Sequence, residues 1–423
     1  MSTTTSDITS AIQSMAEERA EKIIAWRRHF HAYPEVGAHE FETSQYLCDW
    51  LDSLGIPYCR VQGPRPAGFT EERESFIGTG IIATIKGEAP GAYDTEGNPA
   101  RRVALRTDMD ALPITEQTEV PFISQNEGTM HACGHDCHMA MMMGAVEILW
   151  NLRAALKGEV RVIFQPAEEI SIGARDMIAA GALEGVDAIY GAHIWSEVPA
   201  GIISCEAGPR MAFTDWFRID IEGVSAHGSM PHKGVDAVVA AAEVVVAIQA
   251  IVSRRTSPFE PVVVTIGEIH GGTARNIMAG SAYLTGTLRT WHGSVRERII
   301  ERIKRLAEDE ADAFGAKMRF TFEAGNPAVV NDAACSEVAE QAVRKVLGDK
   351  ALGSYEGTLA GEDFAEYLQH IPGVFAFVGT NNPALGAVHP QHSNHYTIDE
   401  SVLANGSKVA AQWACDMLAA DKS

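Results

Sequence analysis

The spacing of apolar and polar residues predicts that helices and strands follow one another along most of the chain. Apolar residues at helical spacing cover 8–33 and stop at Pro34, as a helix should, and a second helical pattern covers 40–54. The apolar runs 78–86 and 103–107 predict strands that we expect to be neighbours. Further elements are a helix at 138–152, a strand at 160–164, a helix at 174–180 and a strand at 188–192. This order predicts an α/β domain with a mostly parallel sheet and helices on both faces.

The middle of the chain has a different order of elements. It predicts strand 216–221, helix 237–254, strands 262–269 and 283–289, helix 295–314 and strand 318–322. This β-α-β-β-α-β order is that of a ferredoxin-like module. The α/β pattern then resumes with helices at 333–347, 362–370 and 401–419 and a strand at 374–378. We therefore expect a discontinuous larger domain, 1–210 and 326–423, and an inserted α+β domain, 211–325.

Composition indicates a soluble globular enzyme and argues against several other classes of protein. The chain has 423 residues, 46% hydrophobic and 21% charged, enough for a sizeable core in one large domain or two. A net charge of -22 would repel phosphate backbones and anionic lipids, so we expect no nucleic-acid partner. We read no apolar stretch as long enough to span a membrane, and the start lacks a signal-peptide pattern. The seven cysteines lack the spacing of a disulfide scaffold, which predicts reduced thiols and a cytoplasmic location.

A cysteine and a histidine lie two residues apart just before the helix predicted at 138–152. Cys133 and His135 flank a flexible glycine within the stretch 131–138 (HACGHDCH). A thiol and an imidazole held in this way can meet one metal ion, and this mixture of donors suits zinc. An ordinary loop with a buried thiol explains the pair equally well when it is taken alone.

Three further clusters of metal-binding residue types lie in the same larger domain. Glu168 and Glu169 follow the apolar strand 160–164, and adjacent carboxylates leaving a strand should point to opposite sides. His193 comes from the end of another apolar strand, and 389–392 (HPQH) adds a fourth cluster. Each cluster also has a structural explanation. Their conjunction predicts a functional site where the strands of the sheet end.

Taken in order, these residues resemble the zinc-dependent aminoacylase and metallo-carboxypeptidase family. The resemblance is to the branch of hippurate hydrolases and auxin-conjugate (indole-acetyl-amino-acid) amidohydrolases, and it covers roughly 26–399. The matching signatures are RRHFHAYPEVGAHEFET at 27–43, ALRTDMDALP at 104–113, MHACGHDCH at 130–138, FQPAEE at 164–169, GAH at 191–193, GGTARNIM at 271–278, GEDF at 361–364 and HPQHS at 389–393. Together they are highly specific.

The resemblance implies two divalent metal ions per subunit, zinc, with manganese or cobalt as alternatives. The implied ligands are Cys133, His135, Glu169, His193 and His392. Glu168 would be the general base, and Asp110 would orient the site from behind the ligands. Asp108 stands where other branches carry a metal-binding histidine, so Cys133 would compensate for that loss. The resemblance leaves open which ligand bridges the two ions.

The resemblance also implies that the inserted domain is a lid and a dimerisation surface. His227, within GVSAHGSMPHKGVDA at 223–237, would reach across a dimer interface to stabilise the tetrahedral oxyanion. This branch more often has GGHAAxPH here, so the neighbouring contacts differ. Asn276 and Arg289 could hold the substrate carboxylate or carbonyl, and structural hydrogen bonding explains them equally well. We expect a homodimer, with a higher homo-oligomer as the alternative.

These features predict a metal-dependent hydrolase acting on the amide bond of small-molecule N-acyl-L-amino acids of the N-acetyl, N-benzoyl or indole-acetyl type. The products would be a carboxylic acid and a free amino acid. The alternative is a dipeptidase or carboxypeptidase with the same dinuclear site, and Asp108 together with Cys133 favours the first activity. A non-catalytic protein of the same fold is disfavoured because Glu168 and all five implied ligands are present.

Overall fold

The computed structural model describes residues 5–69 and 73–420, which form two compact units. One comprises Met1–Gly208, Val330–Glu356 and Glu366–Ser423, and the other comprises Pro209–Val329 and Gly357–Ala365. The predicted domains also include residues 1–4, 70–72 and 421–423, which lie outside the described residues. No pattern of residues predicted that 357–365 would group with the inserted domain.

The larger unit contains a seven-stranded mixed sheet in the order β1-β2-β4-β3-β5-β15-β6. Its strands are β1 (Tyr58–Arg60), β2 (Ile81–Lys86), β3 (Arg102–Asp108), β4 (Glu159–Gln165), β5 (Ala188–Pro199), β6 (Ile203–Ser204) and β15 (Gly373–Asn381). The central four, β4, β3, β5 and β15, are parallel, whereas β1, β2 and β6 pair antiparallel. The predicted parallel arrangement therefore holds for the centre of the sheet, whereas the antiparallel strands at both edges make the whole sheet mixed.

The prediction that β2 and β3 are neighbours is wrong. β4 lies between them and pairs antiparallel with β2 and parallel with β3. The loop 87–101 is long enough to carry the chain past the position that β4 fills later. The sequence shows where strands lie along the chain, but their order in the sheet depends on such connections.

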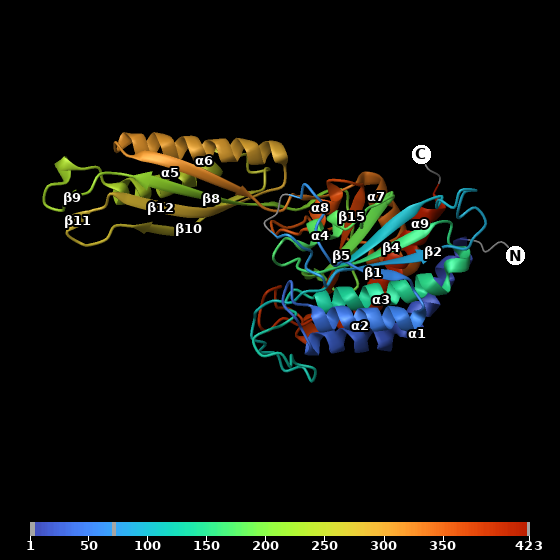
Figure 1. The fold of residues 1–423 in the computed structure, drawn as a ribbon. Helices are drawn as coiled ribbons and strands as arrows, with labels where there is room; N and C mark the ends of the chain where they lie inside the picture. The colour runs from blue at the N-terminus through green and yellow to red at the C-terminus, as the bar shows by residue number, and fades with distance from the viewer. Residues whose placement is uncertain (1–4, 70–72, 421–423) are drawn as a thin grey trace. The chain divides into compact units, whose positions relative to one another are not determined.

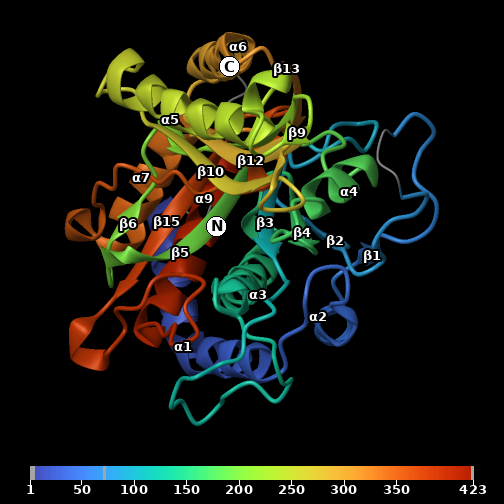
Figure 2. The ribbon, with the colours of Figure 1, turned by 90° about the vertical axis from the view of Figure 1, so that its left-hand side faces the viewer.

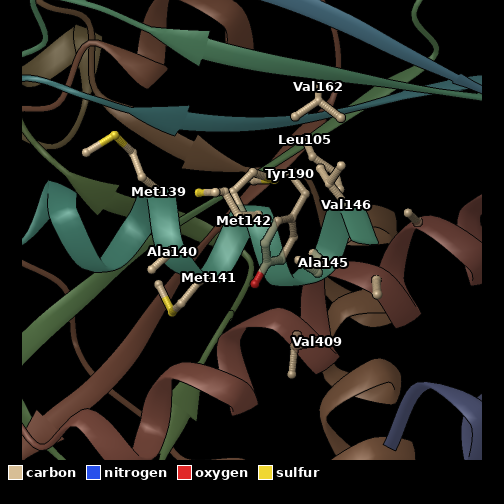
Figure 3. Close-up of a cluster of buried hydrophobic side chains, with 14 of the residues drawn as sticks. Leu105, Met139, Ala140, Met141, Met142, Ala145, Val146, Val162, Tyr190 and Val409 are labelled. Carbon is tan, nitrogen blue, oxygen red and sulfur yellow. The ribbon is translucent and has the colours of Figure 1, made fainter. Parts of the chain in front are cut away.

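Helices cover both faces of this sheet. They are α1 (Thr5–Ala32), α2 (Phe41–Leu54), α3 (His135–Asn151), α4 (Gly173–Ala179), α7 (Ala333–Leu347), α8 (Phe364–Leu368) and α9 (Leu403–Ala419). Figure 1 shows α1, α2 and α3 layered beneath the strands. In Figure 3, α3 lies between two strand residues, Leu105 and Val162, on one side and Val409 of α9 on the other. All three side chains are buried. Side chains alternate along a strand, so Arg106 points to the opposite face, where Gln165 accepts hydrogen bonds from it and from Tyr367 of α8.

The second unit is built on a four-stranded antiparallel sheet with two helices. Its elements are β8 (Phe213–Glu222), β9 (Ala226–His227), α5 (Ala237–Arg255), β10 (Val262–Gly271), β11 (Ile277–Met278), β12 (Ser281–Thr290), α6 (Gly293–Ala313) and β13 (Lys317–Ala324). The sheet order is β10-β12-β8-β13, and β9 and β11 form a separate pair. Figure 2 shows α5 and α6 over the sheet. The main elements follow the predicted β-α-β-β-α-β order. The strands β7 (Gly208–Met211) and β14 (Val329–Asn331) lie where the chain passes between the units.

Helix α5 corrects one statement made from the sequence. By length and composition α5 could span a membrane, so the statement that no apolar stretch approaches that length is wrong for this segment. The helix packs on the sheet through small and branched residues at helical spacing, a pattern expected of a helix that covers a core. These buried residues are Ala237, Ala240, Ala241, Val244, Ile248 and Ile251.

Candidate metal centre

The loop before α3 places a thiol and an imidazole side by side. Gly134 has a φ of 95° and precedes α3, which begins at His135 rather than at the predicted 138. A Cβ on Gly134 would lie 2.4 Å from the side chain of Ile194, so only glycine fits this close approach. The turn directs the Cys133 thiol inward, where Sγ lies 3.4 Å from Nε2 of His193.

His193 presents one ring nitrogen to this thiol. The prediction that it lies at a strand end is wrong, because β5 continues to Pro199 and pairs with β15 along that length. Its Nδ1 lies 2.5 Å from the carbonyl oxygen of Ile194, to which it donates. Burial and the neighbouring His138 lower the pKa of His193, which favours the neutral ring. Nε2 is therefore left as a lone-pair donor facing Cys133.

The two glutamates after β4 converge instead of diverging. We predicted that they point to opposite sides, but Ala167 has a φ of 53°, so the segment turns rather than remaining extended. Glu168 Oε2 lies 4.0 Å and Glu169 Oε1 lies 3.8 Å from Nε2 of His135. Asp110 holds this turn, since its carboxylate accepts the N–H groups of Glu168 at 3.1 Å and Glu169 at 3.0 Å.

His135 is fully buried, and neither of its ring nitrogens has a hydrogen-bond partner. Nδ1 lies 3.3 Å from Oδ1 of Asp110, behind the ring, and Nε2 faces the two glutamates. Burial lowers the pKa of His135, but the carboxylates of Asp108, Asp110 and Glu169 outweigh it and raise the pKa to about 10. Oε1 of Glu169 is also buried without a hydrogen-bond partner. These unpaired donors in a strongly negative environment fit a bound cation.

His392 comes from a loop near the C-terminus and is the most open member of the group. It has a φ of 64°, and its backbone N–H donates to the carbonyl oxygen of Ala132 at 2.8 Å. Nε2 lies 3.5 Å from Oε1 of Glu169, and 54% of the side chain is exposed. Gln391 fixes the loop to β5, because it accepts from Ser196 Oγ at 2.7 Å and donates to the Ile194 carbonyl at 3.0 Å.

The five predicted ligands form two overlapping clusters. The ligand atoms of Cys133, His135 and His193 lie within 4.8 Å of one another, as do those of Cys133, Glu169 and His392. Cys133 belongs to both. Burial and the nearby carboxylates of Glu169, Glu168 and Asp108 raise the pKa of its thiol, so a bound ion must displace a proton. Thiolate, imidazole and carboxylate together are a donor set that suits zinc and neighbouring divalent ions.

Asp108 and His138 lie beside these clusters with their polar atoms already engaged. Asp108 accepts from Arg106 at 2.7 Å and from His138 Nδ1 at 2.7 Å. His138 Nε2 accepts the N–H of Ile194 at 2.9 Å. They therefore support the ligand strands from behind. The sequence showed only that Asp108 replaces a histidine, and no signal along the chain revealed its pairing with His138.

The predicted residues of the inserted domain lie in the second unit. His227 lies on β9, where its Nδ1 accepts the N–H of Ser229 at 3.1 Å, and the carbonyl oxygen of Asn276 accepts the N–H of Gly228 at 2.9 Å. Arg289 lies near the far end of β12, opposite Thr214, and donates to the Leu288 carbonyl at 3.3 Å. Within this unit the structure does not bring Arg289 to Asn276. The roles of all three stay predictions.

Sequence reasoning missed two residues that hold the site, Glu40 and Gln391. Glu40 accepts the N–H of Ala167 at 2.8 Å, directly before the two glutamates. Both residues occur in the quoted signatures at 27–43 and 389–393. Their presence there was the available signal, but their contacts come from segments far apart in the sequence.

Comparisons with known proteins find relatives that match most of this chain. The chain is 37% identical to N-acetyl-L-cysteine deacetylase of Bacillus subtilis, over 92% of this chain and 86% of that protein. It is 39% identical to N-acyl-L-amino acid amidohydrolase of Geobacillus stearothermophilus, over 76% of this chain and 80% of that protein. A solved dinuclear metal-binding peptidase of the M20 family from Bacillus subtilis superposes with a TM-score of 0.80 and 36% identity, covering 95% of this chain and 99% of that one.

The dinuclear neighbour and the two ligand clusters support a site for two metal ions. The model of peptidase family M20/M25/M40 matches residues 104–416, from β3 to the last helix. That match spans all five predicted ligands and Glu168, and it confirms the resemblance to the family, whereas the branch of hippurate and auxin-conjugate hydrolases stays a prediction. The chain belongs to peptidase family M20/M25/M40.

Proposed function

We propose that this protein is a metal-dependent amidohydrolase that cleaves N-acyl-L-amino acids to a carboxylic acid and a free amino acid. The observation that best supports this proposal is the position of the Glu168 carboxylate, next to two ligand clusters that share the thiol of Cys133. The printed activities of the two named relatives, an N-acetyl-L-cysteine deacetylase and an N-acyl-L-amino acid amidohydrolase, support the substrate class.

We propose zinc as the metal, with manganese or cobalt as alternatives. Two groups of residues would hold the ions, Cys133 with His135 and His193, and Cys133 with Glu169 and His392. When bound, such ions polarise the scissile carbonyl and make water more acidic. The negative environment that raises the pKa of His135 would also attract the ions.

Glu168 would move the proton. Its carboxylate takes a proton from the attacking water and passes it to the amide nitrogen, which leaves as the free amine of the amino acid. Asp110 keeps Glu168 in place by accepting its backbone N–H. The same carboxylate faces Nδ1 of His135, an arrangement that fixes the ring with Nε2 toward the glutamates.

His227 would stabilise the oxyanion. Its Nδ1 accepts from the N–H of Ser229, so the proton of the neutral ring is on Nε2, which is then free to donate. We propose that this donor acts on the active site of the partner subunit of a homodimer. Asn276 and Arg289 would hold the substrate carboxylate or carbonyl.

Two features of the second unit support a second copy of this chain as its partner. β10 is an edge strand of the four-stranded sheet, and its Val263 and Ile269 are exposed. The outer face of α5 exposes Val238, Val246 and Val252. An edge strand beside an apolar helix face can pair with its symmetric counterpart. A cytoplasmic location remains part of the proposal, supported by seven cysteines that all lie in the described residues and form no disulfide there.

A substrate panel tests the proposed activity. Metal-loaded protein is mixed with N-acetyl-L-cysteine, other N-acetyl amino acids, N-benzoyl and indole-acetyl amino acids, and with dipeptides and longer peptides. We expect the highest kcat/KM among the N-acyl amino acids. Higher kcat/KM on peptides would instead establish the peptidase alternative.

Subunit mixing tests the role of His227. His227→Ala and Glu168→Gln each damage a different part of the proposed composite site. If His227 acts in the partner's site, a mixed dimer contains one site with both groups intact, and activity should rise above that of either parent. Mixed dimers that form without such a rise would place His227 in its own subunit or outside catalysis.

A further inference from the structure

The segment between α1 and α2 lies against the loops that carry Asp110 and the two glutamates. The N–H of Ala111 donates to the carbonyl oxygen of Glu35 at 2.7 Å, and Val36 forms a bridge with Ala111. A Cβ on Gly37 would lie 3.1 Å from Oδ2 of Asp110 and 3.4 Å from Cα of Ala167. The backbone of this segment therefore contacts both loops closely.

Glu40, at the end of this segment, is fully buried. Its Oε1 accepts two backbone N–H groups, from Ala38 at 3.0 Å and Ala167 at 2.8 Å. Its Oε2 forms a hydrogen bond with Thr79 Oγ1 at 2.8 Å. Oε1 accepts in either protonation state, and a protonated Oε2 would donate to the Thr79 hydroxyl instead. The contact with Ala167 therefore does not depend on the charge of Glu40.

Two buried carboxylates from different parts of the chain hold three consecutive N–H groups. Glu40 accepts from Ala167, and Asp110 accepts from Glu168 and Glu169. Ala167 has a φ of 53°, a conformation that a residue with a Cβ keeps only when its surroundings impose it. The left-handed turn at Ala167 is what brings both glutamates to the same side, toward His135.

We propose that Glu40 is a positioning residue for the carboxylates of Glu168 and Glu169. It holds the left-handed turn at Ala167, and it acts on proton transfer through Glu168 and on metal binding through Glu169. This inference rests on the proposed function for its kinetic consequences. Its structural consequence, the placement of Glu169 for a metal ion, stands without a known substrate.

The test compares two substitutions of Glu40. Glu40→Ala leaves the N–H of Ala167 without its acceptor. Glu40→Gln keeps an oxygen in the Oε1 position and can donate to Thr79, so it should preserve the turn. The matched control is Glu147→Ala, which removes another buried glutamate whose partners, Arg19 and Lys22 of α1 and Trp50 of α2, lie outside the ligand loops.

Zinc titration of metal-free protein and steady-state kinetics provide two independent readouts. Glu40→Ala should weaken zinc binding and lower kcat by about 10–100-fold, as removal of a group behind a metal ligand commonly does. Glu40→Gln should restore most of both, and Glu147→Ala should change thermal stability but neither readout. In a Glu168→Gln background, Glu40→Ala should lower kcat much less than in the wild type.

Other outcomes separate the two proposals. If wild-type protein binds zinc but hydrolyses no N-acyl amino acid, the proposed substrate class fails, while the zinc titration still tests Glu40. Zinc affinity in folded Glu40→Ala equal to that of the wild type would overturn the positioning role. A loss that Glu40→Gln does not reverse would also overturn it, since the oxygen at Oε1 would then not be the relevant group.

Discussion

Replacing Asp110 with asparagine tests how the ligands are held. The Asp110 carboxylate is buried and accepts the N–H of Glu168 at 3.1 Å and the N–H of Glu169 at 3.0 Å, and its Oδ1 lies 3.3 Å from Nδ1 of His135. Asparagine has one acceptor oxygen, so an amide NH₂ must face one of these donors. The substitution keeps the size of the side chain and removes one charge-assisted contact.

The magnitude follows from that lost contact. A hydrogen bond to a charged group contributes about 1.5–3 kcal/mol. At about 1.4 kcal/mol per factor of ten, Asp110→Asn should weaken zinc binding by about 10–100-fold. Competition with a chromophoric chelator measures the zinc affinity, and kcat/KM on the best N-acyl substrate should fall in parallel.

Asp220→Asn is the matched control. Asp220 is a carboxylate of the second unit that pairs with Arg218 and Arg319. It should leave zinc affinity unchanged. Thermal melts of both variants establish that each is folded. Zinc affinity of folded Asp110→Asn equal to that of the control would refute the view that this carboxylate orients the ligands.

Glu168→Gln should lower kcat by about 10²–10⁴-fold with metal content retained, because it removes the base and keeps the shape; loss of metal would make Glu168 a ligand. Cys133→Ala should reduce binding of both ions, because the thiol belongs to both clusters. The control is Cys205→Ala, which removes another buried thiol. Equal metal content in the two variants would remove Cys133 from the ligand set. Burial and nearby carboxylates raise the pKa of the Cys133 thiol, and carboxylates raise the pKa of His135 to about 10, so both hold protons at neutral pH without metal. Metal affinity should therefore rise with pH and protons should be released on binding, as calorimetry in buffers of different ionisation enthalpy would show; a pH-independent affinity would contradict the site.

Much of the fold could be predicted because local patterns determine it. The helix pattern at 237–254 corresponds to α5 (Ala237–Arg255), whose buried residues recur at helical spacing. In β12 (Ser281–Thr290), buried residues alternate with more open ones because one face of the strand packs on a core. The position of β4 between β2 and β3 could not be predicted, because it depends on pairings between residues far apart in the chain.

The candidate site likewise combines features that local patterns predict with features that depend on contacts between distant segments. The donor side chains were recognisable as residue types in short signatures, and their grouping followed from the resemblance. Their orientations depend on backbone conformations that composition does not reveal, such as the φ of 53° at Ala167 and of 64° at His392. For that reason the sequence suggested diverging carboxylates where the structure has converging ones. Glu40 and Gln391 were missed because each acts through the backbone of another segment.

Stepwise reconstitution of metal-free protein tests the central claim most directly. Metal is removed with a chelator, then zinc, manganese or cobalt is added in steps while bound metal and turnover of an N-acetyl amino acid are measured together. The two ligand clusters predict no turnover without metal and full turnover only when about two ions are bound per subunit. Full activity in metal-free protein would contradict this account.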